Sequence, residues 1–487
     1  MRRFSTTWLR PGALVACAAL VLAACATVVN GQPRTGNAPP AQMTVHGDSH
    51  GAFDQTVKNA ISDVADFWTT EFPTVSGGKP FRPLKGGLWS VDGLKVAQTH
   101  DAGEASKEAC AGRDPGFVVD NGAFCTLDDS IAWDRAPTHL FPQLEQKYGP
   151  LMVAMIFAHE FGHAIQYRLG IFNRDLPTIF TESQADCAAG AWTAWAMKGN
   201  AAHFRDVTAA DVDHALVGFL DARDRTPGSS SEVASGHGNG FDRLSAVADG
   251  IQKGASYCYS KGYYESRTFT ERPYASQTDY EAGGNVDFSE VVKPGSKNFF
   301  INDLNRFWTN AAQQISKPFT PVEIAEAPKP PCASPPTEFG YCPQDNKVYF
   351  DQSFAQHAYN SVPGLEVDSS NGNVRLVDNQ PGDFALGVLF AIGWGMAVRH
   401  QLFNRPLDDQ GALTAAVCYT GAYAKDINLT DFDTEHKFIL SPADLDEAAS
   451  SMLDQVGKPE AFGARGTTGL DRVQDFVKGY RGGLSAC

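Results

Sequence analysis

Residues 149–170 read GPLMVAMIFAHEFGHAIQYRLG, and this stretch decides the fold around it. Pro150 suits the first turn of a helix, and Gly170 is a typical residue just after a helix end. A second apolar segment, Ile179 to Met197, is entered through a Pro-Thr pair and left through a Gly-Asn pair. The sequence therefore predicts two helices joined by a short turn, which can pack against each other as a hairpin.

Two histidines lie one turn apart in the first of these helices, in His159-Glu160-Phe161-Gly162-His163. Residues four apart share one helix face, so both imidazoles can reach a single Zn²⁺ while Glu160 projects beside it. Glu160 is then placed to act as a general base. The alternative is a pair of histidines that simply belong to the core or surface of a helix.

The second helix offers a third ligand in Glu182. A catalytic zinc ion normally takes three protein ligands and leaves one position for water. Asp186 lies four residues further on the same face, where it can accept the free ring N–H of a ligand histidine. We therefore predict one zinc ion per chain on His159, His163 and Glu182; the alternative for the two carboxylates is a solvated acidic helix face.

An internal duplication organises the rest of the chain. Residues 61–69, ISDVADFWT, recur at 301–309 as INDLNRFWT, and further blocks match in the same order. We expect two copies of one unit, residues 53–258 and 293–487, joined by a Tyr-rich connector at 259–292.

The second copy lacks every proposed ligand. Segment FAHEFGHA at 157–164 aligns with FAIGWGMA at 390–397. Such coordinated loss is expected if the polar side chains converge on one buried site, because burying them without a metal is costly. We expect the apolar replacements to pack as core between two helices. The replacements are His159 by Ile392, Glu160 by Gly393, His163 by Met396, Glu182 by Leu413 and Asp186 by Val417.

The same comparison singles out His237, which falls opposite Gly466, whereas Arg243 is retained as Arg472. We predict that His237 donates a hydrogen bond to the oxyanion of a tetrahedral intermediate and that Arg243 is structural. The alternative is that His237 is an ordinary residue of a polar Gly/Ser loop. His203 and His214 are expected at the surface.

The composition and the N-terminus indicate an exported protein. In 487 residues, 40 Lys and Arg against 56 Asp and Glu give a net charge of −16, which argues against nucleic acids and anionic headgroups as electrostatic partners. Residues 1–25 have the layout of a signal peptide, and its end, Leu-Ala-Ala-Cys25, resembles a bacterial lipobox in which Cys25 is lipidated. The alternative is a plain signal peptide cut nearby.

With residues 26–52 as a tether, we expect a lipid-anchored protein on the extracytoplasmic face of the bacterial cell membrane. No later segment approaches the roughly 18 apolar residues of a membrane span.

Eight further cysteines form an even set, which in an exported chain suggests disulfides. Pairing within each copy leaves three connectivities per copy, and sequence proximity decides between them. The favoured pairs are Cys110–Cys125, Cys187–Cys258, Cys332–Cys342 and Cys418–Cys487.

Segments AHEFGHAIQ at 158–166, ESQADC at 182–187 and His237-Gly238 together resemble a family of neutral zinc metallopeptidases, especially its exported actinobacterial lipoprotein members. The resemblance covers residues 100 to 260. It implies a zincin-like, mainly helical domain that acts on a peptide or protein substrate, in a chain of α+β class that is mainly α. The chain departs from the family at Ala164, where members often carry a further histidine, and in its degenerate second copy.

Two other functions stay open. In a non-catalytic envelope lipoprotein, zinc would only tie two helices together while the second copy binds a partner; such a site should have four protein ligands, and the sequence offers no fourth. A peptidoglycan amidase or endopeptidase would use the same zinc site on a cell-wall amide.

Overall fold

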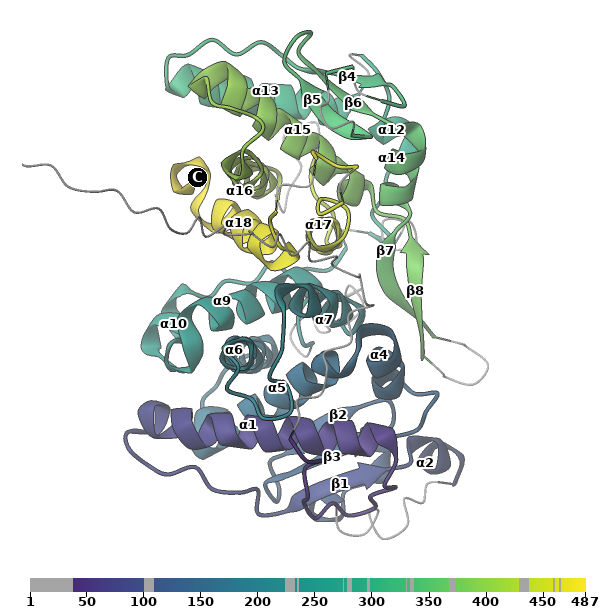
Figure 1. The fold of residues 1–487 in the computed structure, drawn as a ribbon, viewed down its shortest axis with the longest axis vertical. Helices are drawn as coiled ribbons and strands as arrows, with labels where there is room; N and C mark the ends of the chain where they lie inside the picture. The colour runs from purple at the N-terminus through teal and green to yellow at the C-terminus, as the bar shows by residue number, and fades with distance from the viewer. Residues whose placement is uncertain are drawn as a thin grey trace, which may run out of the picture. The chain divides into compact units, whose positions relative to one another are not determined.

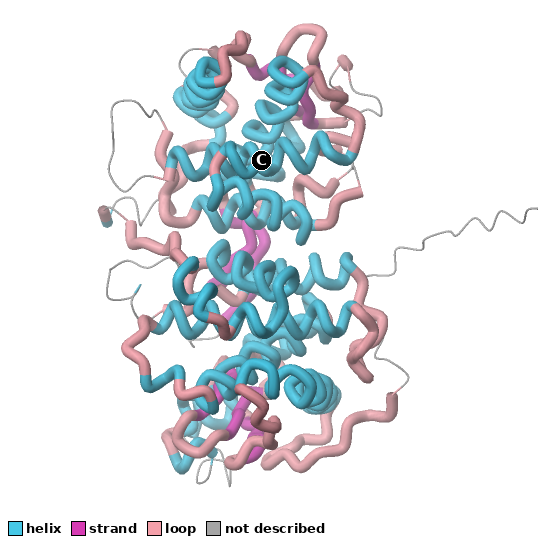
Figure 2. The backbone as a smooth tube through the Cα atoms, turned by 90° about the vertical axis from the view of Figure 1, so that its left-hand side faces the viewer, coloured by secondary structure: helices cyan, strands magenta, loops and turns pink. Residues whose placement is uncertain are grey.

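The computed structural model describes residues 38–99, 109–223, 233, 236–274, 276–277, 283–295, 298–329, 331–332, 337–367, 374–428, 438–458, 460–463 and 466–487. The signal peptide, lipidation of Cys25 and the first part of the tether lie outside these residues and stay predictions. The described chain is α+β and mainly helical, with small sheets, as expected (Figures 1 and 2).

In the first half, helices surround a three-stranded sheet. Strand β3 is central; it pairs in parallel with β1 and antiparallel with β2, which leaves β2 at an edge. The elements are α1 (Ala52–Ser76), β1 (Gly87–Val91), α2 (Gly93–Thr99), β2 (Gly122–Cys125), β3 (Ser130–Asp134), α4 (Leu140–Tyr148), α5 (Pro150–Arg168), α6 (Thr178–Met197), α7 (Ala209–Asp221) and α9 (Gly240–Cys258).

The second half contains a sheet of the same pattern, in which β6 pairs in parallel with β4 and antiparallel with β5. Short helices α10 (Lys261–Ser266) and α12 (Phe288–Val291) precede it. The further elements are α13 (Phe299–Gln314), β4 (Glu323–Glu326), β5 (Phe339–Cys342), β6 (Lys347–Phe350), α14 (Gln352–Tyr359), β7 (Val362–Val367), β8 (Val374–Gln380), α15 (Asp383–Phe403), α16 (Gln410–Ile427), α17 (Asp444–Leu453) and α18 (Gly469–Gly482).

Two glycines allow equivalent helix crossings in the two halves. A Cβ on Gly162 would lie 2.8 Å from the Cα of Ala185, so α5 and α6 touch closely at this point. A Cβ on Gly395 would lie 2.7 Å from the Cα of Ala416, and α15 meets α16 in the same way. Any larger residue would force the helices apart, because backbone atoms cannot yield as a side chain can. This crossing is what brings residues of α5 and α6 to one site.

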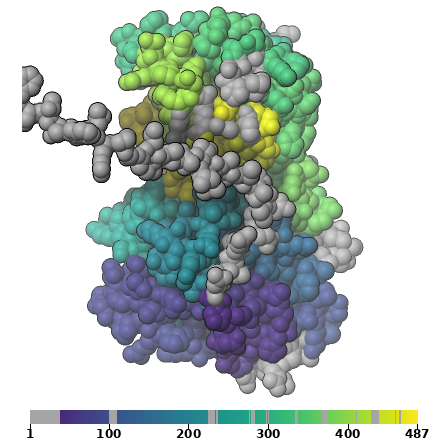
Figure 3. All heavy atoms as spheres, viewed as in Figure 1, coloured from purple at the N-terminus to yellow at the C-terminus, as the bar shows by residue number. Residues whose placement is uncertain are grey.

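The apolar residues that replace the proposed ligands are buried, as expected. Ile392, Met396, Leu413 and Val417 are each at most 3% exposed and belong to the main hydrophobic cluster. That cluster also includes residues of the first half, and the rings of Phe241 and Phe476 lie 5.8 Å apart. In Figure 3 the residues coloured purple to teal and those coloured green to yellow adjoin each other on the face in view. The two halves therefore share apolar core.

Among the described residues there are four disulfides, two within each half. They join Cys110 to Cys125, Cys187 to Cys258, Cys332 to Cys342 and Cys418 to Cys487, the pairs that sequence proximity favours. The two long links span 71 and 69 residues. One joins α6 to the end of α9, and the other joins α16 to Cys487, five residues after the end of α18.

Helix α15 corrects one expectation about membranes. It is long and apolar enough to span a bilayer, so a later segment does reach the length that the sequence analysis found missing. However, 78% of its apolar window is buried inside the protein, which is typical of a core helix.

Candidate metal centre

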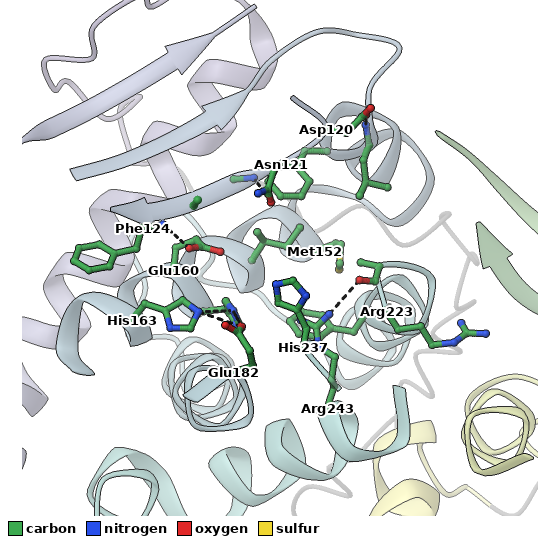
Figure 4. A pocket seen from close by; sticks show the side chains of 18 of the residues that line it. Asp120, Asn121, Phe124, Met152, Glu160, His163, Glu182, Arg223, His237 and Arg243 are labelled. Atoms are coloured by element: carbon green, nitrogen blue, oxygen red, sulfur yellow. Dashed lines mark hydrogen bonds and ion pairs between the residues drawn. The ribbon is translucent and has the colours of Figure 1, made fainter. Parts of the chain in front are cut away.

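Two ring nitrogens from α5 and one carboxylate oxygen from α6 converge at one point. Nε2 of His159 lies 3.0 Å from Nε2 of His163 and 3.1 Å from Oε2 of Glu182. Nε2 of His163 lies 3.2 Å from the same oxygen, and all three residues are less than 10% exposed. Figure 4 shows His163 and Glu182 pointing toward each other across the space between their helices. The sequence-predicted ligands are therefore together in space.

The hydrogen bonds of His163 fix which of its ring nitrogens carries the proton. Nδ1 lies 2.8 Å from Oε1 of Gln166. The amide of Gln166 donates through Nε2 to the carbonyl of Thr181 at 2.6 Å and to Oε1 of Gln184 at 3.0 Å, so its oxygen must accept. Gln184 in turn donates to the carbonyl of Cys258 at 2.9 Å. This chain of amides leaves the proton on Nδ1 of His163 and a lone pair on Nε2.

His159 is fixed in the same tautomer by Asp186. Its Nδ1 lies 2.7 Å from Oδ1 of Asp186, which accepts because it is a carboxylate. Arg243 donates to both oxygens of Asp186, at 3.0 and 3.1 Å. Arg243, expected to be structural, thus holds the carboxylate that contacts Nδ1 of His159, one of the predicted ligands.

The charges around the three converging atoms favour a cation. Burial opposes a charge on His159, but Asp186 and Glu182 outweigh it and raise the pKa of the ring to about 10. Burial also opposes the charge of Glu182, yet His163 and His159 hold its pKa well below the usual value. Without a metal ion, a proton on His159 therefore supplies the positive charge that the three atoms favour.

The arrangement fits zinc. Ligands about 2.0–2.1 Å from a tetrahedral zinc ion lie roughly 3.3 Å from one another, close to the separations of 3.0, 3.1 and 3.2 Å between these atoms. Two imidazoles and one carboxylate are also a donor set that zinc accepts. Among the described residues, the cluster holds these three groups, one fewer than a closed structural site.

Glu160 lies beside the three ligands and faces the edge strand β2. Its Oε2 accepts a hydrogen bond of 2.7 Å from the backbone N–H of Phe124. Burial raises the pKa of its carboxyl group, although the two histidines oppose this. A cavity of about 460 Å³ opens here, lined by Glu160, all three ligands, Phe124 and His237 among others (Figure 4).

Of the other predicted residues, His237 lines this cavity and is exposed, which leaves its part in catalysis a prediction. The expectation of a surface position is wrong for His203, which is 6% exposed and contacts Asp63 through Nδ1 at 2.7 Å. His214 is half-buried, with its ring 5.3 Å from that of Tyr148.

Sequence reasoning missed Gln166 and Gln184, both fully buried in the amide chain behind His163. A signal for them exists. With the alignment offsets of the predicted ligand segments, Gln166 falls opposite Arg399 and Gln184 opposite Ala415, so neither glutamine has a counterpart in the second half, as is true of the predicted ligands.

No protein-family model matches the chain, and comparisons with curated proteins and with solved structures give no match either. The function is therefore argued from the geometry of the site alone.

Proposed function

We propose that this chain is a zinc-dependent metallopeptidase that hydrolyses peptide bonds on the outer side of the cytoplasmic membrane, as a lipid-anchored protein. The observation that carries the proposal is the convergence of three electron-pair donors. Asp186 and Gln166 fix the protons of both histidines on Nδ1, so the Nε2 lone pairs face each other and the Glu182 carboxylate. Such an arrangement is repulsive unless a cation lies between the three atoms.

When bound, zinc would lower the pKa of a water molecule toward ~7 and polarise the carbonyl of the scissile bond. Glu160 accepts the proton of the attacking water and delivers it to the leaving amine. The hydrogen bond from the N–H of Phe124 keeps one of its carboxylate oxygens in place, so that the other can exchange the proton. Exposed His237, on the same cavity, can donate a hydrogen bond to the developing oxyanion.

A peptide substrate is supported by the strand that borders the cavity. β2 is an edge strand, and Gly122, Ala123 and Phe124 line the cavity together with the ligands. An edge strand offers unpaired backbone groups to an extended chain. In β2 the N–H groups of Gly122 and Phe124 are already held by Asn121 and Glu160, so its carbonyl groups are the ones we expect a peptide to contact. The same edge could hold the peptide of a cell wall, and digestion of a peptide library beside purified wall peptides separates the two substrates.

We propose further that residues 53–258 form a zincin-like unit and 293–487 a degenerate copy. Both halves have one parallel and one antiparallel strand pair around a central strand. Their long disulfides span 71 and 69 residues, and their helix crossings use glycines at aligned positions. Independent folds would not be expected to share all three features.

Catalysis is favoured over a purely structural zinc site by two observations. The ligand group has three members, and a 460 Å³ cavity adjoins it with the Glu160 carboxylate at its wall. A structural site would be closed by a fourth ligand and would have no use for a carboxylate beside it.

The test is the variant Glu160→Gln, which preserves shape and should retain zinc. We expect it to bind zinc as the wild type does and to lose peptide hydrolysis by about 10²–10⁴-fold, because only the proton acceptor is removed. His163→Ala, as the matched variant, should lose both zinc and activity. Full activity in Glu160→Gln would rule out the mechanism, and a wild-type chain that binds no zinc would rule out the proposal.

A further inference from the structure

A second cluster of possible metal ligands lies in the second half of the chain, away from the site above. Asp383 is the first residue of α15, and Asp444 and Glu447 lie on the first turn of α17. One carboxylate oxygen from each lies within 4.8 Å of the others. All three residues are at most 3% exposed, so three acidic groups share one buried volume.

Most of the carboxylate oxygens in this acidic cluster have known hydrogen-bond donors. Oδ2 of Asp383 accepts from the N–H of Val286 at 2.9 Å, and Oε2 of Glu447 accepts from the N–H of Phe384 at 2.8 Å. Asp444 accepts from the backbone N–H and the hydroxyl of Ser441. These donors are neutral, so they hold the carboxylates in place without cancelling their charge.

One of the two remaining carboxylate oxygens is buried without any donor. Oδ1 of Asp383 is buried and has no hydrogen-bond partner. An unpaired carboxylate oxygen in the interior costs several kcal/mol unless a proton or a metal meets it. Since Oδ2 is held by Val286, Oδ1 is the oxygen of Asp383 that remains for a ligand.

We propose that Asp383, Asp444 and Glu447 bind a hard divalent cation, with Ca²⁺ as the best candidate. An all-oxygen set of carboxylates is what Ca²⁺ prefers. Oxygens on opposite sides of that ion are about 4.6–5.2 Å apart, and the three oxygens of the cluster all lie within 4.8 Å of one another, close enough to share one ion. The set contains no nitrogen or sulfur donor, which separates it from the histidine site of the first half.

Burial and mutual repulsion disfavour the charged forms of the carboxyl groups in the acidic cluster. Burial and the charge of Asp383 raise the pKa of Asp444 well above its usual value, with Arg272 opposing the shift. Burial together with Asp444 and Asp383 does the same to Glu447. Arg272 brings one positive charge against three carboxyl groups, and its guanidinium donates to the carbonyl of Leu440 and to Asn428. A divalent cation would complete the balance.

The acidic cluster lies where the connector meets the helices α15 and α17. Val286 belongs to the connector between the halves, and the side chain of nearby Asn285 accepts from the N–H of Asp383 at 2.9 Å. A Cβ on Gly382 would lie 2.9 Å from the carboxylate of Glu447, so only glycine lets that carboxylate come so close. A bound cation would therefore join the connector, α15 and α17.

The aligned positions of the first half provide an internal comparison. At an offset of 233, Asp383 falls opposite Pro150 and Glu447 opposite His214, whereas Asp444 falls opposite Asp211. Asp211 forms a capping box with Thr208, which accounts for an aspartate at that position in both halves. The two additional acids belong to the second half, which carries none of the zinc ligands.

The experiment uses the full-length chain, stripped of metal by a chelator and titrated with Ca²⁺ alone and with Mg²⁺ alone. We expect one Ca²⁺ per chain by calorimetry and a rise in Tm with Ca²⁺ concentration. Asp383→Asn should weaken Ca²⁺ binding at least about tenfold, because affinity follows the number of ligand charges. Without Ca²⁺ it should melt no lower than the wild type, since it relieves repulsion between buried carboxylates.

Three further variants complete the test. Glu447→Gln should repeat the loss, and Asp454→Asn, at the exposed end of the same helix, should leave Ca²⁺ binding unchanged. His159→Ala should also leave it unchanged, so failure of the zinc proposal would be distinguishable. A wild-type chain that binds neither ion at millimolar concentration, with the carboxyl groups simply protonated, would overturn the inference, as would unaltered affinity in Asp383→Asn.

Discussion

Nδ1 of His163 donates a hydrogen bond of 2.8 Å to Oε1 of Gln166, three residues further along the same helix. The side-chain amide of Gln166 donates two hydrogen bonds through Nε2, so it cannot flip, and its Oε1 must face His163. The ring of His163 is thereby held with its Nε2 lone pair toward His159 and Glu182 before any metal arrives. A hydrogen bond of this kind to a ligand histidine normally orients the ring and also raises the affinity for the metal.

Removing this support should weaken zinc binding without removing a ligand. We expect Gln166→Ala to reduce zinc affinity by about 10–100-fold, measured by competition with a chromophoric chelator. Gln42→Ala is a suitable control, because Gln42 lies far from the site in sequence, is exposed and donates to Pro40. Equal zinc affinity in the wild type and Gln166→Ala would mean that the hydrogen bond is incidental.

The zinc content should be close to one per chain. Among the described residues, the cluster of two histidines and a carboxylate lies in the first half, and Ile392, Met396 and Leu413 stand at the aligned positions of the second half. Elemental analysis after dialysis against free zinc tests this, with His159→Ala as the variant that should read near zero. A zinc content near two would contradict the prediction that the second half binds no zinc.

Restoring the ligands in the second half should destabilise the protein. The triple variant Ile392→His, Met396→His and Leu413→Glu exchanges buried apolar side chains for polar ones. Each of the three contributes on the order of 1.5–3 kcal/mol through burial. We expect a clearly lower Tm and no tight zinc binding, because nothing equivalent to Asp186 or Gln166 stands behind these positions. Tight zinc binding at unchanged Tm would refute both the core assignment and the alignment of the halves.

Asp242 should reduce stability near neutral pH. Burial raises its pKa from 3.8 to about 6, although Arg267 and the N–H of Thr270 oppose the shift. The folded state thus holds the proton more tightly than the unfolded state, and stability falls as the pH rises from about 4 to about 6. Asp242→Asn should raise the free energy of unfolding at pH 7 by up to about 3 kcal/mol, and the gain should vanish below pH 4. Denaturant melts of both proteins at pH 3.5 and 7 measure this; equal gains at both pH values would exclude titration of Asp242 as the cause.

Local patterns in the sequence were sufficient for the two helices that carry the site and for the proposed ligands. Pro150 and Gly170 bound one helix, the spacing of His159 and His163 places both on one face, and the replaced positions of the second half identify residues that belong together. These inferences need only the period of a helix and the chemistry of the side chains.

Contacts between distant segments could not be predicted in this way. Three contacts join residues that are 36, 57 and 64 positions apart. They are the hydrogen bond from Phe124 to Glu160, the ion pair of Arg243 with Asp186, and the approach of the Asp383 and Glu447 carboxylates. Periodicity describes one element at a time and carries no information on how elements cross. The sequence by itself indicated which groups of the first half could bind a cation. The tertiary structure decided which oxygens and nitrogens meet, and it alone brought Asp383, Asp444 and Glu447 together, because helix crossings such as that at Gly162 depend on packing between whole surfaces.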